Sequence, residues 1–315
     1  MKNIIFFGSD DDVINQMYKD LETNENVLYK KGIINLKNKF LKLIFSITFS
    51  KKINQFLKIP FKKNWFKYFL EKEINISKKP IFIFTKDNLK YLEFGFANYL
   101  KKLYPKCKIV LLFLDIHGLR GYDFNTLNGL YDYAYTFDEL EAKKYSINYY
   151  PLCYSHSEYE DIEKKYDICF IGQDKGRIDK IYSLFLNAKK CGLKTKIIIC
   201  GKCDKKSKYP EFEYVDHISY NDALKFISQS KYNVEICLQD TTSISIRLYE
   251  AIMFNQGLIT NNSYISKSPY YDDSFVHIID FDNINLDFIN GYKKKENSIL
   301  KEKISPLGFI KCLED

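Results

Sequence analysis

Short apolar runs alternate with longer amphipathic stretches along most of this chain. A short apolar run bounded by polar residues is typical of a buried strand, whereas apolar positions at three- and four-residue spacing are typical of a helix. The segment between 87 and 104 shows the second pattern, with apolar side chains at Leu89, Leu92, Phe96, Tyr99, Leu100 and Leu103. Regular alternation of the two patterns favours parallel strands joined by crossover helices.

The alternation falls into two series. In the first, we expect strands at 3–7, 80–85, 108–115 and 133–136 and helices at 87–104 and 137–145. In the second, we expect strands at 167–171, 195–200, 212–215, 232–238 and 256–260 and helices at 177–191, 220–230 and 245–254. The stretch 149–152, ending near 155–157, is expected to link them. The pattern therefore predicts two doubly wound domains, residues 1–154 and 155–315, the second with a lysine-rich helical tail from Lys293.

Composition agrees with a folded protein of two domains. The 315 residues are about twice the roughly 150 residues of a typical domain. The chain contains 26 Tyr, 25 Phe and 1 Trp, more aromatic residues than a disordered chain carries. No apolar run reaches the roughly 18 to 20 residues that a membrane span needs, and the N-terminus lacks the apolar stretch of a secretory signal. We therefore expect the protein in the cytosol, with its eight scattered cysteines reduced.

Residues 37–72 combine positive charge with many aromatic and aliphatic side chains. Ten lysines stand against Glu71 alone. A basic amphipathic surface with aromatic residues is typical of contact with an anionic membrane, where each lysine adds on the order of 1 kcal/mol. Nucleic acid suits the same features, but no RNA-binding signature is present and the charge excess is local. The simpler alternative is that the aromatic residues belong to the core and the lysines face solvent.

A glycine-containing loop follows the first strand of the second series. In the run Ile-Gly-Gln-Asp-Lys-Gly-Arg at 171–177, Gly172 and Gly176 allow close backbone approach, while Lys175 and Arg177 supply positive charge. Amide groups and cations at the start of a helix suit a phosphate. The loop lacks the full dinucleotide fingerprint and the Walker motif. An ordinary strand-to-helix turn with a solvated lysine is the alternative interpretation.

A hydroxyl-rich loop precedes the helix predicted at 245–254. Ser243 or Ser245 can cap that helix and leave amide groups for an anion. Arg247 lies in the first turn, where a guanidinium can clamp a diphosphate bidentately, and Glu250 follows three residues later, where a carboxylate can accept hydrogen bonds from a ribose diol. The alternative is an Arg–Glu ion pair on the helix surface. The apolar run at 251–253 argues against it, because it buries the helix and directs its first turn toward a cleft.

Together these segments resemble the C-terminal domain of GT-B glycosyltransferases, in particular bacterial lipopolysaccharide and capsule enzymes. The matching residues are the loop at 171–177, Gly201 after a strand, and the runs 218–224, 247–251 and 258–261. The segments 131–142 and 149–152 resemble the end of the family's N-terminal domain. The resemblance covers roughly 130–265 and implies two Rossmann-like domains facing a cleft, with a nucleotide-sugar donor held mostly by the second domain.

Carried over by position, the resemblance implies a set of donor-binding residues. It places Gly172, Lys175 and Arg177 at the phosphates, Tyr220 at the base, Arg247 at the diphosphate, Glu250 at the ribose, and Gly201, Thr242 and Ser243 beside the donor. Many retaining members carry a second glutamate eight residues before the position of Glu250, where this chain has Thr242. Inverting and retaining mechanisms therefore both stay open.

An inverting reaction needs a general base on the acceptor side. Asp10, after the first strand, and Asp115 with His117, after another, are placed at strand carboxyl ends. Each is equally well explained as a helix cap or a loop residue. The resemblance implies no metal and no cofactor, because GT-B relatives offset the charge of the leaving diphosphate with cations and helix N-termini.

The predicted function is transfer of a sugar from a nucleotide sugar, with UDP-sugars favoured, to a cell-surface glycan or a lipid-linked acceptor. We expect a peripheral protein at the inner face of the cytoplasmic membrane, attached through residues 37–72, with no nucleic-acid partner. Two alternatives stay open. One is a non-catalytic regulatory nucleotide-binding protein of the same architecture, and the other is a nucleic-acid-binding protein that uses the basic segment.

Overall fold

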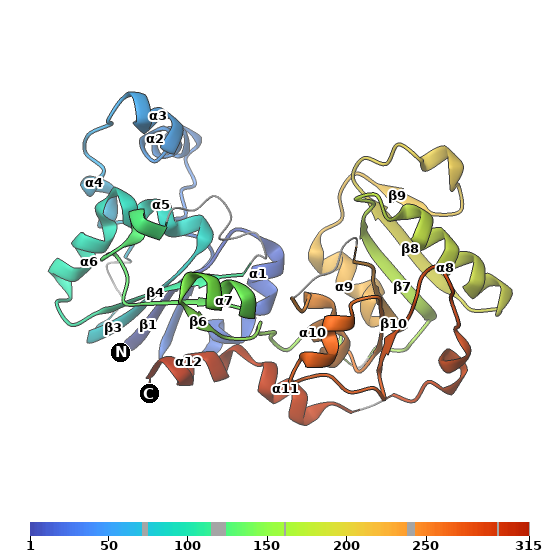
Figure 1. Ribbon diagram of the computed structural model, residues 1–315. Coiled ribbons are helices and arrows are strands. Elements are labelled where there is room, and N and C mark those ends of the chain that lie inside the picture. Colours follow the sequence, from blue (N-terminus) through green and yellow to red (C-terminus); the bar gives the residue numbers. More distant parts are fainter. Residues whose placement is uncertain (71–74, 115–123, 161, 238–242, 295, 315) are drawn as a thin grey trace. The chain divides into compact units, whose positions relative to one another are not determined.

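The computed structural model describes residues 1–70, 75–114, 124–160, 162–237, 243–294 and 296–314. The chain forms two compact units, Met1–Pro151 and Leu152–Asp315. Within the described residues, each unit contains one parallel sheet of six strands, flanked by helices (Figure 1). This confirms the predicted fold class of two doubly wound, Rossmann-like α/β domains. The division between the units lies three residues before the predicted boundary.

The first unit contains the strands that the apolar runs predict and two short strands that they do not. Its strands are β1 (Lys2–Phe7), β2 (Val27–Lys30), β3 (Ile76–Thr85), β4 (Lys108–Phe113), β5 (Tyr133–Thr136) and β6 (Asn148–Tyr149). Its helices are α1 (Asp12–Met17), η1 (Lys19–Thr23), α2 (Lys39–Thr48), α3 (Lys51–Phe56), α4 (Lys63–Phe66), η2 (Lys86–Asn88), α5 (Leu89–Tyr91), η3 (Leu92–Phe96), α6 (Ala97–Leu103), η4 (Phe124–Leu127) and α7 (Glu139–Tyr145).

The strand order in the first unit is β2-β1-β3-β4-β5-β6. The chain thus adds β2 on one side of β1 and then continues on the other side with β3. In doubly wound sheets, ligands bind at the carboxyl ends of the two strands where this reversal occurs. The residues that follow β1 and β3, including Asp10 and Asp87, therefore lie at the position where this fold builds its sites.

The helix predicted at 87–104 is interrupted. It consists of α5, the π-helical turn η3 and α6, and Gly95 within η3 has φ of 101°. A residue with a β-carbon rarely adopts that conformation, whereas glycine does so at little cost. The apolar spacing predicts the helical segment correctly but carries no information about this break.

The second unit has the same architecture. Its strands are β7 (Tyr166–Gln173), β8 (Thr195–Cys200), β9 (Glu213–Val215), β10 (Ser230–Glu235), β11 (Gly257–Thr260) and β12 (Val276–Ile278). Its helices are α8 (Ile178–Lys190), η5 (Lys206–Lys208), α9 (Tyr220–Ser228), α10 (Ile246–Met253), η6 (Ser263–Lys267), η7 (Asp287–Gly291), α11 (Ser298–Ile304) and α12 (Pro306–Glu314). The tail after Lys293 contains the predicted helices, and one side of it belongs to the core, because Ile304, Phe309, Ile310 and Leu313 are buried.

The strand order in the second unit is β12-β11-β10-β7-β8-β9. Here the chain reverses between β7 and β10, which pair in parallel. The predicted loop at 171–177 begins in the last residues of β7 and leads to α8, and α10 follows β10. The two segments that the sequence singles out for donor binding therefore meet at the same edge of the sheet.

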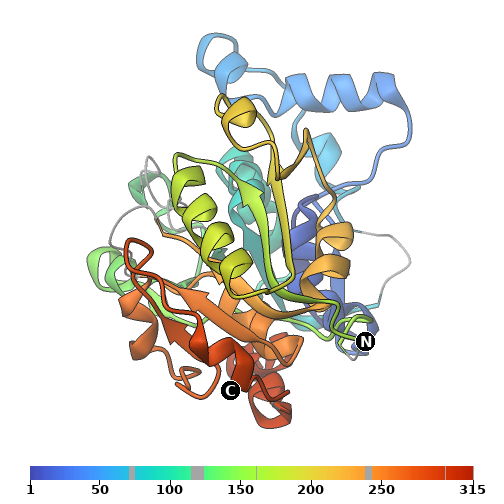
Figure 2. The same ribbon diagram turned by 90° about the vertical axis from the view of Figure 1, so that its right-hand side faces the viewer.

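The basic segment at 37–72 divides into core and surface residues. Phe49, Phe66 and Phe69 are buried in the core of the first unit, which supports part of the simpler interpretation. Phe56 and Phe61, in contrast, expose 93% and 74% of their surface. Both views show α2 and α3 projecting from the rest of the first unit (Figures 1 and 2). Among the described helices, none has both the length and the apolar character needed to span a bilayer.

Gly257, the first residue of β11, packs directly against the buried ring of Tyr232 on β10. A β-carbon at this glycine would lie 2.1 Å from Cε1 of that ring. We therefore predict that Gly257→Ala lowers the free energy of unfolding by about 1–3 kcal/mol, the usual cost of overpacking a core. Urea unfolding followed by circular dichroism measures the loss. Gly291→Ala is the matched control, because a β-carbon there has no neighbour within 4 Å. Equal unfolding midpoints for the two variants would contradict the prediction.

Candidate functional site

Arg177 lies at the carboxyl edge of the second unit's sheet, between the ends of β7 and β10, where the strand order reverses. Its Nη1 donates to the carbonyl of Ile236, just beyond β10, at 2.8 Å, and its Nε and Nη2 donate to the carbonyl of Gln173 at 3.2 and 3.1 Å. The guanidinium also lies over the ring of Phe170, 5.1 Å from its centroid. A β-carbon at Gly172 would stand 3.3 Å from Nη2, so the glycine makes room for this side chain. Arg177 thus joins β7 to β10 as well as bringing charge to the edge.

At the loop 171–177, two backbone amides that could bind a phosphate are hydrogen-bonded to the loop's own aspartate. Asp174 Oδ1 accepts hydrogen bonds from the amides of Gly176 at 3.1 Å and Ile178 at 3.0 Å. Lys175 is exposed and has a left-handed backbone with φ of 46°. A phosphate bound at this loop would therefore have to replace the Asp174 carboxylate on these amides or bind to the cations beside them.

Residues in the first turn of α10 form the centre of the candidate site. Ser245, rather than Ser243, caps this helix, because its hydroxyl accepts from the Arg247 amide at 3.2 Å. Arg247 Nη1 then donates to Glu250 Oε2 at 2.7 Å, and its Nη2 donates to the carbonyl of Ile171 at the end of β7 at 2.5 Å. Its side chain is 21% exposed. A guanidinium has five N–H donors, and two of those of Arg247 have acceptors among the described residues.

Glu250 is fully buried, and both of its carboxylate oxygens accept hydrogen bonds. Besides Arg247, the donors are Asn233 Nδ2 at 2.8 Å and the hydroxyl of Tyr220 at 2.7 Å. Burial alone would lower the pKa of Arg247, but the adjacent Glu250 carboxylate outweighs it and raises the pKa above its ordinary value. The Arg–Glu pair predicted as the alternative is thus present, but it is a buried pair and not a surface one.

Two tyrosines extend this network. Tyr220 donates to Glu250, so Tyr154, whose hydroxyl lies 3.0 Å from that of Tyr220, is the donor in the second contact. Burial raises the pKa of both tyrosines, and the Glu250 charge raises it further. Both hydroxyls therefore stay protonated at neutral pH, as the direction of the hydrogen bonds requires.

The other residues predicted to bind the nucleotide-sugar donor lie in separate segments of the second unit. Gly201 follows β8 with φ of 78°. Ser243 is buried, and its carbonyl accepts from Asn262 Nδ2 at 3.0 Å. Thr242 lies outside the described residues. The structure therefore brings Gly172, Arg177, Tyr220, Arg247 and Glu250 to one edge, while the assigned contacts of Tyr220 with a base and of Glu250 with a ribose stay predictions.

The first unit has a pocket of about 530 Å³ at the carboxyl ends of β1, β2 and β3. Asp10 lines it, and its carboxylate forms no hydrogen bond or ion pair with the described residues. Asp11, not Asp10, caps α1, through bonds from the amides of Val13 and Ile14. Gly32, with φ of 94°, leaves space for the Asp10 carboxylate, since a β-carbon there would lie 3.1 Å from Oδ1. Asp10 is therefore a pocket residue. Asp115 and His117, the other predicted bases, lie outside the described residues.

A hydrogen-bond network holds the loop that carries Asp10. Asn88 Nδ2 and Thr85 Oγ1 donate to the carbonyl of Gly8, at 2.5 and 3.0 Å. Ser9 donates to Asp87 Oδ2 at 2.5 Å. Burial raises the pKa of Tyr91 on the pocket wall, and the Asp10 and Asp87 charges raise it further. Sequence analysis does not identify Asp87, although its position after β3, across from β1, is the signal that would have found it.

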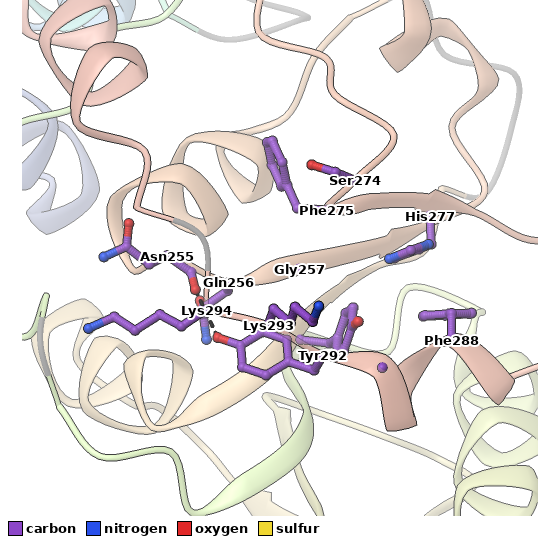
Figure 3. A pocket seen from close by; sticks show the side chains of 12 residues that line it. Asn255, Gln256, Gly257, Ser274, Phe275, His277, Phe288, Tyr292, Lys293 and Lys294 are labelled. Carbon is purple, nitrogen blue, oxygen red and sulfur yellow. Dashed lines mark hydrogen bonds between the residues drawn. The ribbon is translucent and has the colours of Figure 1, made fainter.

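A different pocket, of about 470 Å³, lies at the opposite, amino edge of the second unit's sheet (Figure 3). Gln256, Gly257 and Phe275 line it where β11 and β12 begin, together with His277, whose ring stacks on Phe288 at 4.0 Å between centroids. None of the predicted donor residues lines this pocket. It is therefore separate from the candidate site.

The described residues offer no preformed metal site. They contain no group of three or more His, Cys, Asp or Glu side chains arranged to hold a metal ion. The expectation that neither a metal nor a cofactor takes part stays a prediction.

Comparisons with known proteins find similar structures. No family model matches the sequence, and no curated protein matches it. The chain is similar to a UDP-forming trehalose-phosphate synthase from Burkholderia xenovorans, with 12% identity, a TM-score of 0.45 and coverage of 82% of this chain and 84% of that one. It is similar to an α-glucosyltransferase solved with UDP-glucose and DNA containing an abasic site, with 9% identity, a TM-score of 0.48 and coverage of 82% and 79%.

A similar structure of another kind is a UDP-GlcNAc 2-epimerase from Methanocaldococcus jannaschii, solved with UDP-GlcNAc and UDP. It has 12% identity, a TM-score of 0.38 and coverage of 88% of each chain. Both units are doubly wound α/β domains by their own strand orders, independently of these likenesses.

The buried Arg247–Glu250 pair predicts strong energetic coupling. Glu250→Gln leaves a partly buried guanidinium without its counter-charge, and Arg247→Met leaves a buried carboxylate, so each is expected to cost about 3–5 kcal/mol of stability. The double variant should cost clearly less than the sum, because neither charge is then left alone. Urea unfolding of the four proteins measures the coupling. Additive losses would show that the two side chains do not stabilise each other.

Proposed function

We propose that this protein is a glycosyltransferase that uses a nucleotide sugar, with UDP-sugars favoured, and transfers the sugar to a cell-surface glycan or a lipid-linked acceptor. The observation that carries the proposal is the orientation of Arg247. Glu250 and the Ile171 carbonyl hold its guanidinium at the carboxyl edge where the strand order reverses, beside the loop at 171–177. A fixed planar fork of donors at that point suits a diphosphate.

The proposed reaction assigns roles to residues of both units. An acceptor hydroxyl attacks the anomeric carbon, the bond from that carbon to the diphosphate oxygen breaks, and the nucleoside diphosphate leaves. Arg247, with Lys175 nearby in the loop, would stabilise the negative charge of the leaving group. Asp10 would accept the hydroxyl proton, because its carboxylate lines the first unit's pocket and has no hydrogen-bond or ion-pair partner among the described residues. This assignment applies to an inverting reaction, and the retaining alternative stays open.

Two substitutions test the donor and acceptor roles separately. Arg247→Lys keeps a cation beside Glu250 but loses the bidentate fork, so we expect UDP affinity to fall about 10- to 100-fold in titration calorimetry while the fold remains. Asp10→Asn should leave UDP affinity unchanged and lower the rate of sugar transfer by at least 100-fold. Lys190→Ala, an exposed change on α8, is the control for binding. UDP binding without turnover of any UDP-sugar would instead indicate a regulatory nucleotide-binding protein.

We also propose that residues 37–72 attach the protein to an anionic membrane, at the inner face of the cytoplasmic membrane. Support comes from the exposed lysines of this segment. Lys39, Lys52, Lys58 and Lys63 are exposed and form no ion pair with the described residues. Their charges are therefore available to anionic lipid headgroups, at on the order of 1 kcal/mol each.

Charge reversal tests this attachment. Replacing Lys39, Lys52, Lys58 and Lys63 by Glu should weaken binding to phosphatidylglycerol vesicles by at least 100-fold, since about 1.4 kcal/mol corresponds to a factor of ten. Co-sedimentation at fixed ionic strength measures it. The control has the same change in total charge elsewhere, with Lys189, Lys190, Lys303 and Lys311, all exposed, replaced by Glu. Undiminished attachment of the first variant, or equal loss in both, would remove the proposal.

A further inference from the structure

The helix α2 has apolar side chains on two opposite faces. Its inward face packs on the core, where the ring of Phe45 lies 5.7 Å from that of Tyr91 and 5.3 Å from that of Trp65. Its outward face carries an apolar row at helical spacing, Phe40, Leu43, Ile44 and Ile47, which are 68%, 57%, 36% and 41% exposed. A helix on the surface of a globular domain is normally polar on its outward face. This outward row therefore marks a surface that a partner covers.

The inward face of α2 also forms part of the Asp10 pocket. Lys42 and Phe45 line that pocket together with Asp10, Asn35 and Tyr91. Carboxylate, amide and ammonium groups next to aromatic rings are what a sugar requires, since its hydroxyls both donate and accept hydrogen bonds and its C–H faces pack on rings. One ten-residue helix thus joins a polar pocket to an exposed apolar surface.

The apolar surface continues from α2 into the next segments. Ile53, Phe56 and Leu57, at and after α3, and then Phe61 are exposed as well. The lysines between them carry the excess positive charge of residues 37–72. A second copy of the chain on this surface would bring two such sets of like charges together, which opposes association. The interfacial region of an anionic bilayer matches both the apolar side chains and the charge.

We infer that the acceptor is a membrane-embedded glycolipid, whose sugar enters the Asp10 pocket while its apolar chain lies against the outward face of α2. The inference rests on the proposed function, because it names the acceptor class of that same reaction. It assigns to α2 the role of presenting a bilayer lipid to the pocket, so a soluble sugar would lack half of the recognition surface.

Alkyl glycosides test the inference without a donor. The probes are the β-D-glucoside, β-D-galactoside and β-D-N-acetylglucosaminide, each as methyl and dodecyl forms, used below micelle-forming concentrations. The fluorescence of Trp65, the single tryptophan, reports binding because its ring contacts Phe45 of α2. We expect at least one dodecyl glycoside to bind at least tenfold more tightly than its methyl form. Vesicles of phosphatidylglycerol with brominated acyl chains should quench the same fluorescence.

A matched pair of double variants isolates α2. Leu43→Ser with Ile47→Ser should abolish the advantage of the dodecyl chain and the quenching, and leave the affinity for the methyl glycoside unchanged. Leu103→Ser with Leu140→Ser removes two leucines that are 48% and 50% exposed elsewhere on the first unit, and should retain both properties. In transfer assays with a UDP-sugar that turns over, the same contrast should show in KM for the dodecyl glycoside and not in kcat for the methyl form.

Three results would overturn the inference: equal affinity of the wild-type protein for methyl and dodecyl forms, a dodecyl advantage that survives the α2 changes, or a dimer that the α2 changes dissociate with no binding to vesicles. Absence of turnover with every UDP-sugar would overturn the proposed function alone, because the chain-length dependence of glycoside binding is measured without a donor.

Discussion

The candidate donor site depends on one buried carboxylate, that of Glu250. A charge without exposed surface is tolerated only when it is paired and fully hydrogen-bonded. Three donors meet this requirement, from α10 itself, from β10 and from the start of α9. The position of Arg247 follows from this need, because its Nη1 satisfies Glu250 while its Nη2 reaches the end of β7. The Arg247–Glu250 pair thus first joins four elements, α9, α10, β7 and β10, and the functional proposal builds on the remaining N–H donors of Arg247.

Much of the fold is encoded in local patterns. Apolar runs such as those of β8 and β11 predict strands because strands of a parallel sheet are buried on both faces. The short strands β2, β6 and β12 have two to four residues each, too few to show a period. They form because each pairs with a longer neighbouring strand. The break at Gly95 depends on a backbone angle, which apolar spacing does not report.

The candidate sites show the same limit. The spacing of Arg247 and Glu250 on one helix is legible in the sequence, but Asn233 is 17 residues from Glu250, and Tyr154 is 66 residues from Tyr220. Only the strand order brings such residues together. The basic segment illustrates a different gap, since phenylalanines in the same run, Phe49 and Phe56, have opposite burial. Composition alone does not separate a core aromatic residue from a surface one.

Tyr154 extends the hydrogen-bond network of Glu250 to the segment that begins the second unit. It lies three residues after Pro151, where the first unit ends. Its amide donates to the carbonyl of Ile304, the last residue of α11, at 2.7 Å, and its hydroxyl meets Tyr220. The segment that begins the second unit is therefore held in place by hydrogen bonds from both the backbone and the side chain of Tyr154. Three consecutive hydrogen bonds, through Glu250 and Tyr220, connect the Arg247 guanidinium with the hydroxyl of Tyr154.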